Sequence, residues 1–306
     1  MKSSGVEPPA NILLVADDFA ISEGVTEGIE QLARAHRISA TSAIVTLPRW
    51  KHDGARLAAL RCDIAIGLHV NLTVGEPIGA LPSLAPDGKF PTLGTLIAKA
   101  TTGRVKPDEV HKEILLQLRR FEEFAGYPPD FIDGHQHVHA LRGIRDAFVG
   151  AIAEHFAGQH PLPLVRIPHD NPAGLLRRAR ARSKALLLAG LSAGFRRAVL
   201  RAGFACNDTF AGVTTFGATQ ADVTRDLEAA ATGGGPIHLV MCHPGVPSDE
   251  LARLDPLLAR RSAELCVLAS DNALTSGMLH PSRRDPRSPI DWKAWPDATS
   301  QSARRA

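Results

Sequence analysis

Short apolar runs alternate with stretches of helical periodicity along most of the chain, and this alternation constrains the fold more than any other feature. The runs that predict strands are residues 11–16, 39–46, 63–68, 131–133, 164–167, 210–213 and 236–241. Helices are predicted between them at residues 22–36, 55–60, 107–121, 144–156, 175–201, 221–231 and 257–269. Strands separated by helices are typical of parallel βαβ units. We therefore expect an α/β fold, with a (β/α) barrel that is irregular or incompletely closed.

The remaining segments predict how this barrel is bounded. We expect one domain over residues 11–278, with an N-terminal tail at 1–10 and a C-terminal tail at 279–306. Residues 71–103 are rich in Gly, Pro and Thr, which predicts a long functional loop. Residues 172–205 predict a basic helical excursion, since seven Arg and one Lys occur between 172 and 206 without an acid. We interpret it as a solvated face packed beside the barrel, with a membrane-surface or nucleic-acid helix as the alternative.

Composition excludes several classes of protein. A net charge of +3 is too small to indicate a nucleic-acid partner. No segment approaches the roughly 18 to 20 apolar residues of a membrane span, and residues 1–10 lack the apolar core of a signal peptide. We therefore expect a cytoplasmic protein, with homo-oligomerisation left open. Its four cysteines form no Cys-x-x-Cys pair, which argues against a zinc knuckle or a disulfide framework.

Residues suited to chemistry follow the ends of the predicted strands. They are Asp17, Asp18, His69, the cluster beginning at His135, Arg166 and His243. In a parallel barrel the carboxyl ends of the strands converge on one rim, where active sites of such barrels lie. An open doubly wound sheet would also gather strand ends, but the Gly-x-Gly-x-x-Gly fingerprint of dinucleotide binding is absent.

The adjacent carboxylates Asp17 and Asp18 end an apolar run. Two neighbouring carboxylates repel, and burying them is costly unless a cation or hydrogen bonds compensate. Because side chains alternate along a strand, we expect the two to leave it in different directions, so that one binds a metal ion and the other handles protons. The alternative is a strand that leaves the core through a polar turn.

The second informative stretch is DGHQHVH at residues 133–139. Three histidines at period two would share one face of a strand, whereas His135 and His139 would share a face of a helix, and a loop would impose neither. Histidine is a common metal ligand, and a carboxylate such as Asp133 can fix its tautomer. One Asp with two His suits a hydrolytic Zn, Co or Mg centre as well as a non-haem iron oxygenase, so the ligand types alone do not decide the reaction.

Seven stretches resemble, in the same order, the YdjC family of carbohydrate deacetylases, which includes chitooligosaccharide deacetylases and hopanoid-biosynthesis relatives. They are LVADDF (14–19), SATS (39–42), IGLHVNLT (66–73), GEP (75–77), IDGHQHVH (132–139), VRIP (165–168) and MCHPG (241–245). The resemblance spans about residues 11–270. Ala20 stands where the family usually has Gly, a change that we expect to affect a turn and not the chemistry.

The resemblance implies a barrel related to polysaccharide deacetylases, with one divalent metal ion (Mg, Zn, Co or Ni) held by Asp18, His69 and His135. It also implies that Asp17 acts as the base in hydrolysis of an N-acetyl amide on a small sugar. His243 is our candidate for the general acid that protonates the leaving amine. The alternative for His243 is a histidine in a structural turn beside Pro244.

Other residues near the predicted rim are candidates for support or substrate contact. Arg166 could orient the acetyl group or a sugar hydroxyl, or could pair with a buried acid. We expect Asp133, His137 and His139 to support the site, and Asn71 and Thr73 to contact either the sugar or water.

The leading hypothesis is a metal-dependent carbohydrate deacetylase. One alternative is a metal-dependent phosphoesterase, which would need a second metal and phosphate-binding Arg or Lys on the rim. The other is a non-catalytic sugar- or lipid-binding barrel.

Overall fold

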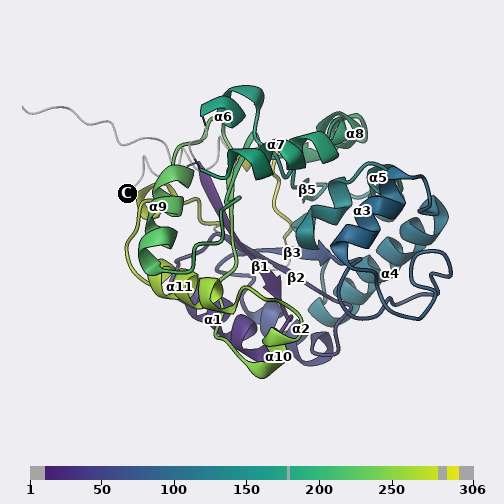
Figure 1. Cartoon of the computed structure of the whole chain (residues 1–306), viewed down its shortest axis with the longest axis horizontal. Coiled ribbons are helices and arrows are strands. Elements are labelled where there is room, and N and C mark those ends of the chain that lie inside the picture. Colours follow the sequence, from purple (N-terminus) through teal and green to yellow (C-terminus); the bar gives the residue numbers. More distant parts are fainter. Residues whose placement is uncertain (1–10, 178–179, 282–287, 296–306) are drawn as a thin grey trace, which may run out of the picture.

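The structure is a computed structural model that describes residues 11–177, 180–281 and 288–295. Its eight strands form a single sheet in which each pairing is parallel. The strands are β1 (Ile12–Phe19), β2 (Ala40–Ala43), β3 (Ala65–Val70), β4 (Phe131–Gly134), β5 (Leu164–Val165), β6 (Ala205–Cys206), β7 (Thr209–Ala211) and β8 (His238–Cys242). Their order is β6-β5-β4-β3-β2-β1-β8-β7. Helices surround the curled sheet (Figure 1), which confirms an irregular α/β barrel.

Helices lie between most successive strands and also follow the last one. They are α1 (Glu23–Arg34), α2 (Trp50–Ala59), α3 (Leu93–Thr101), α4 (Pro107–Ala125), α5 (Arg145–His155), α6 (Pro172–Arg177), α7 (Arg182–Leu191), α8 (Phe195–Arg201), α9 (Gln220–Ala230), α10 (Asp249–Ala252) and α11 (Leu258–Leu268), with 3-10 helices η1 (His135–Ala140) and η2 (Thr275–Gly277). Ser22 caps α1 as predicted, since its hydroxyl accepts from the backbone N–H of Val25.

Two sequence predictions about these elements were wrong. Residues 71–103 are not one loop, because they include α3. The hydroxyl of Thr92 caps this helix at Thr95, and Leu96 and Ala100 are buried, so packing stabilises a helix that the preceding Gly and Pro residues obscured. The strand β6 was not predicted at all, because Ala205 was assigned to the end of the helical excursion and no apolar run marks these two residues.

The barrel is joined at its seam by a single stretch of chain. β6 pairs with β5 and β7 pairs with β8, although only Asn207 and Asp208 separate β6 from β7. The Asn207 amide replaces the missing backbone bonds: its oxygen accepts from Ile167 N at 2.7 Å, and its nitrogen donates to the carbonyls of Ile167 and Thr209 at 3.0 Å. The barrel is therefore continuous along the chain but incompletely closed by hydrogen bonds in the described residues.

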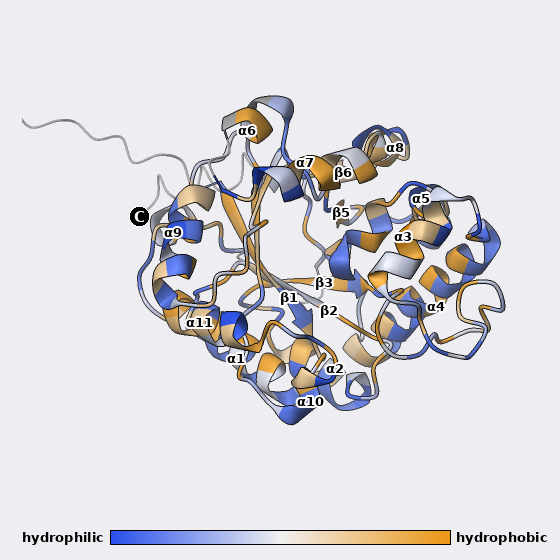
Figure 2. Ribbon diagram, in the orientation of Figure 1, coloured by the Kyte–Doolittle hydropathy of each residue, from blue (hydrophilic) through white to orange (hydrophobic). Residues whose placement is uncertain are grey.

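Alternation along the strands divides the core into two clusters. In β1, Ile12, Leu14 and Ala16 pack in the large cluster shared with the helices. Leu13 and Val15 belong to the cluster that fills the barrel interior. The strands are predominantly hydrophobic in Figure 2, as expected when both faces of a parallel sheet are covered.

The interior cluster is extended by residues near the end of the sequence. It includes Ile290, Trp292 and Trp295, and the indole N–H of Trp292 donates to the carbonyl of Asp130 at 2.6 Å. Residues 288–295 therefore pack against the end of the barrel where β4 begins. The rest of the predicted tails, at 1–10, 282–287 and 296–306, lies outside the described residues.

The basic excursion at 172–205 is helical, as predicted, and consists of α6, α7 and α8. It leaves the barrel after β5 and returns at β6. Over the part of the chain that the structure covers, none of the helices combines the length and apolar character needed to cross a bilayer.

Candidate active site

The strand pattern continues past the apolar interior into a layer of polar side chains. At the carboxyl ends of five neighbouring strands, an inward position beyond the interior cluster carries a polar residue, since inward positions recur every second residue. On β3 this polar residue follows the inward Gly67, which has no side chain. These residues are Asp17, Ser42, His69, Asp133 and Arg166, and all are buried. The polar layer therefore lies at the carboxyl ends of the strands, the position expected for an active site in such a barrel.

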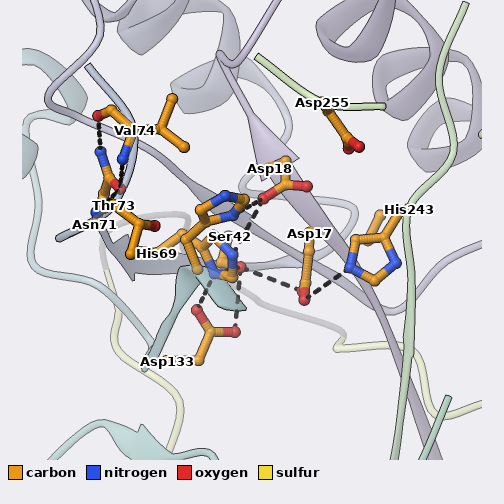
Figure 3. A network of polar contacts seen from close by, with 12 residues as sticks. Asp17, Asp18, Ser42, His69, Asn71, Thr73, Val74, Asp133, His243 and Asp255 are labelled. Carbon is orange, nitrogen blue, oxygen red and sulfur yellow. Dashed lines mark hydrogen bonds and ion pairs between the residues drawn. The ribbon is translucent and has the colours of Figure 1, made fainter. Parts of the chain in front are cut away.

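Asp18 departs from this alternation. Its φ is +72°, and the register between β1 and β2 shifts between Ala16 and Phe19. Asp is one of the few residue types that visit the left-handed region. The irregularity gives both carboxylates partners within the site (Figure 3).

Asp18 is the carboxylate that faces the histidines. Its Oδ1 lies 2.8 Å from His135 Nδ1 and 3.2 Å from His69 Nε2, and the potential ligand atoms of the three residues all lie within 4.8 Å of one another. Its Oδ2 accepts from Arg261, which also pairs with Asp255. Burial alone would raise the pKa of Asp18, but His135 and Arg261 hold it well below its usual range.

His69 is oriented by a second carboxylate. Its Nδ1 lies 2.6 Å from Asp133 Oδ1, which leaves Nε2 directed at Asp18. Burial would lower the pKa of His69, but the charges of Asp133 and Asp17 outweigh it and raise the pKa to about 10. A carboxylate behind a histidine is the usual support of a metal ligand. The donor set of Asp18, His69 and His135 thus fits one divalent ion.

Asp17 is clamped by an arginine. The two Nη atoms of Arg166 donate to its two carboxylate oxygens at 2.7 and 2.6 Å, and Arg166 Nη2 also lies 2.5 Å from Asp133 Oδ2. Burial opposes ionisation of Asp17, yet Arg166 and the nearby His69 and His243 lower its pKa to about 2. Of the two roles considered for Arg166, the geometry matches pairing with buried acids.

His243 flanks Asp17 on the side away from Asp18 (Figure 3). Its Nε2 lies 3.8 Å from Asp17 Oδ2, too far for a hydrogen bond. The side chain is partly exposed, at 27%, whereas the side chain of Asp17 is 2% exposed. The backbone N–H of His243 donates to Glu264 at 2.5 Å, which holds the start of this loop against α11.

The three clustered histidines contact three different partners. Gln136 and His137 have φ values of 52° and 60°, so neither a strand nor a regular helix relates them. His135 reaches Asp18, His139 Nε2 lies 2.9 Å from the carbonyl oxygen of Arg166, and His137 packs edge-on against the ring of Phe210. Burial lowers the pKa of His139 to about 4, and burial together with Arg166 lowers that of His137.

Asn71 shapes the loop that follows β3. It is fully buried, and its amide donates to Thr46 Oγ1 at 2.7 Å and to the carbonyl of Val74 at 2.6 Å. Its Oδ1 accepts from the backbone N–H groups of Thr73 and Val74 at 3.0 Å. The Thr73 hydroxyl is buried with no hydrogen-bond partner in the described chain. Asn71 therefore holds the loop and presents no free polar group.

Sequence reasoning did not single out Ser42, Arg261, Asp255 or Glu264. Ser42 Oγ lies 3.0 Å from His69 Nδ1 and 3.1 Å from Asp133 Oδ2. Its position at an inward strand end, two residues after the interior Ala40, was an available signal. Arg261 gave none, because an arginine on an amphipathic helix ordinarily faces water.

Comparisons with known proteins give matches over most of the chain. A family described as YdjC-like protein matches residues 11–276. The chain is 29% identical over 255 residues to a carbohydrate deacetylase of Mus musculus, covering 79% of this chain and 80% of that one. It is 36% identical over 157 residues to a chitooligosaccharide deacetylase of Proteus mirabilis, covering 51% of this chain and 58% of the relative.

A solved structure has the same fold. It comes from Enterococcus faecalis and is provisionally described as a cellobiose-phosphate cleavage protein. The TM-score is 0.65 at 20% sequence identity, over 90% of this chain and 98% of that one.

Proposed function

Since the chain belongs to the YdjC-like protein family, we propose that it is a metal-dependent carbohydrate deacetylase that hydrolyses the amide of an N-acetylated sugar or short oligosaccharide. The names of the relatives support the reaction class. The observation that carries the proposal is the convergence of Asp18, His69 and His135 beside a separate, ionised carboxylate, Asp17. A site with both metal ligands and a proton acceptor is suited to hydrolysis, whereas a site that only binds a sugar or lipid has no need of the proton acceptor.

Asp18, His69 and His135 would hold one divalent ion. Such an ion lowers the pKa of a coordinated water and polarises a carbonyl oxygen. Asp133 keeps His69 in the orientation that presents Nε2, and Arg261 engages the carboxylate oxygen of Asp18 that does not face the histidines. The chain thus supplies two of the three ligands with their own supporting partners.

Asp17 is the proposed base. Arg166 keeps it ionised at neutral pH. Its Oδ1 also accepts from the Ser42 hydroxyl at 3.5 Å, whereas Oδ2 retains a lone pair beyond the one that accepts from Arg166. A carboxylate with a pKa of about 2 is a weak base toward ordinary water. Asp17 is thus placed to accept a proton, and an ion held by Asp18, His69 and His135 would supply the lowered pKa of the water.

His243 is the proposed acid. Its imidazole adjoins Asp17 and is the more exposed of the two groups, so a sugar amine leaving from the rim can reach it. An amine leaves as a neutral species only if it gains a proton, and a protonated imidazole is suited to donate one near neutral pH. We propose that Asn71 and Thr73 shape the neighbouring loop, and that His137 and His139 support the site.

The phosphoesterase alternative fits less well. The acids Asp17 and Asp133 with His69 form a second possible ligand group, but Arg166 already neutralises both carboxylates. Arg166 and Arg261 are both paired with buried acids, so their charges are already compensated.

The proposal is tested by acetate release from N,N′-diacetylchitobiose, with and without chelation and re-addition of Zn, Co, Ni or Mg. We expect activity to require an added divalent ion and to fall by about 100-fold or more in Asp17→Asn. The matched control is Asp146→Asn, because the Asp146 side chain on α5 is 81% exposed. It should keep wild-type activity.

Metal binding is measured separately by calorimetry. We expect Asp18→Asn to weaken Zn binding by at least tenfold, since one of the three proposed metal ligands is lost. Activity that survives complete metal removal, or that is unchanged in Asp17→Asn, would contradict the mechanism. Metal binding without acetate release from any N-acetyl sugar would instead favour phosphoesterase activity or a non-catalytic sugar- or lipid-binding barrel.

A further inference from the structure

The basic excursion, residues 172–205, has no role in the chemistry described above. It begins six residues after Arg166 and contributes α6, α7 and α8, which lie along one edge of the molecule (Figure 1). Seven Arg and one Lys occur between 172 and 206 with no Asp or Glu. The catalytic proposal does not explain why a segment of this length is basic and lacks acids.

Exposed apolar side chains concentrate on the same segment. Of the six large hydrophobic residues exposed among the described residues, four belong to it: Leu176 (71%), Leu186 (50%), Leu187 (64%) and Leu200 (53%). A fifth, Phe216, lies under the ammonium group of Lys184 on α7, 3.6 Å from its ring centre. Exposed apolar residues that are gathered in this way mark an interaction surface, whereas scattered ones do not.

Helix geometry directs these leucines outward. In α7 only Ala185 is buried, and successive residues are about 100° apart, so Leu187 lies on the opposite side of the helix. In α8 the buried Phe195 and Val199 face the protein, which places Leu200 toward solvent. Figure 2 shows hydrophobic colour on these solvent-facing helices.

Basic side chains accompany the leucines. Arg197 and Arg201 on α8 are exposed, and neither forms an ion pair with any residue in the described ranges. Together with Leu175 and Leu200 they border a cavity of about 780 Å³ between α6 and α8. Leu200 therefore shares one open surface with Arg197 and Arg201, and Asp170 lines the same cavity.

We propose that this excursion docks the protein on the surface of an anionic lipid bilayer. Helices with exposed leucines beside basic residues lie in the membrane interface, with the apolar side chains at the acyl boundary and the cations among the phosphates. A second copy of the chain is a poorer occupant, because pairing two such surfaces would bring like charges together. Nucleic acid would use the arginines but would leave the leucines in water.

The test is co-sedimentation with vesicles of phosphatidylcholine alone or mixed with phosphatidylglycerol, at low and high ionic strength. We expect the protein to bind the mixed vesicles, to release at high salt, and to bind neutral vesicles far more weakly. Arg197→Gln/Arg201→Gln should weaken binding by about 20-fold, and Leu186→Ser/Leu187→Ser by about tenfold or more.

The matched control is Arg104→Gln/Arg119→Gln, which removes the same charge from exposed positions outside the excursion. It should bind as the wild type does. Circular dichroism and acetate release from a small sugar should be unchanged in all three variants, since none alters the candidate site. Vesicle binding does not depend on catalysis, so the co-sedimentation result tests this proposal whether or not the protein is a deacetylase.

Three results would overturn the proposal. The first is no binding to anionic vesicles. The second is equal weakening by the control pair, which would show a response to net charge alone. The third is a dimer that Leu186→Ser/Leu187→Ser dissociates, together with no vesicle binding, which would assign the surface to a second copy of the chain.

Discussion

The acids of the site are each held by a buried arginine. Asp17 and Asp133 share Arg166, and Asp18 shares Arg261 with Asp255. A buried ion pair is not in itself strongly stabilising, but removing one partner leaves the other charged and without compensation. The arginines thus compensate the charges of Asp17 and Asp18 in a site where both carboxylates are buried.

Arg261 provides the first prediction. Arg261→Met should lower the free energy of unfolding by about 3 kcal/mol, because Asp18 and Asp255 lose their common cation. Urea denaturation without added metal measures this loss. The control Arg253→Met replaces an exposed arginine that lies before the same helix and should cost little. A loss below about 1 kcal/mol for Arg261→Met would mean that the pair is not essential to the fold.

His139 provides a prediction about pH. Its pKa of about 4 in the folded protein lies below the usual value of 6.5, so the unfolded chain takes up a proton first as pH falls. The stability that depends on neutral His139 is present above pH 6.5 and is lost as pH falls toward 4. By linkage, this amounts to about 2 kcal/mol between pH 7 and pH 5.

Replacing His139 should therefore flatten the pH dependence of stability. His139→Gln should be less stable than the wild type at pH 7, because burial and the hydrogen bond to Arg166 are disturbed, but it should lose about 2 kcal/mol less on going to pH 5. Urea denaturation at the two pH values measures the difference. The exposed control His52→Gln should keep the wild-type dependence, and parallel curves for His139→Gln and wild type would refute the explanation.

At the level of the elements, β3 and β4 pack closely because Gly67 has no side chain. A Cβ on Gly67 would lie 2.5 Å from the ring of Phe131, which fills the barrel interior beside it. The register that pairs Gly67 with Phe131 also pairs His69 with Asp133, two residues further along each strand. The packing of the interior thus sets the contact that orients a candidate metal ligand.

This relation predicts a measurable coupling. Gly67→Ala should destabilise the protein by about 2 kcal/mol through overpacking, and the smaller side chain of Phe131→Leu should relieve much of that cost in the double variant. Thermal or urea denaturation of the four proteins completes the cycle. Gly94→Ala, in α3, meets no atom within 4 Å and should be neutral or slightly stabilising. Additive effects of the first two changes would argue against direct contact.

At the scale of the molecule, one end of the barrel carries the candidate site and the other end contributes to stability. The carboxyl ends of the strands carry the polar layer, and the opposite end is packed by apolar residues that include Trp292 from segment 288–295. This segment lies beyond the 11–276 range that the family matches. It contributes to stability without reaching the candidate site.

Trp292→Ala should accordingly lower the free energy of unfolding by about 3 to 5 kcal/mol, since a large buried side chain and its hydrogen bond to Asp130 are lost. Denaturation measures the loss, and Lys293→Ala at the neighbouring exposed position serves as the control. Acetate release per folded molecule should remain near the wild-type level at a temperature where both proteins are folded. A selective loss of activity would contradict the separation between the two ends.

The sequence was informative wherever a pattern is local. Short apolar runs predicted the strands β1, β3 and β4, and the residues that end them predicted the rim where Asp17, Asp18 and His69 lie together. The conformation of Asp18 was not predictable, because its positive φ depends on the shift between two strands. The sequence likewise left the directions of the three clustered histidines open, since they arise from two left-handed residues in η1.

By itself, the sequence determined the α/β class, the set of strand ends and most of the residue types that meet there, because alternation and capping depend on neighbouring residues. Only the tertiary structure decided which partner each acid has: Arg166 for Asp17, and Arg261 with the two histidines for Asp18. Arg261 is 243 residues from Asp18 in the chain. Such a pairing has no local signature, since its energy comes from shared burial that exists only once the barrel has formed.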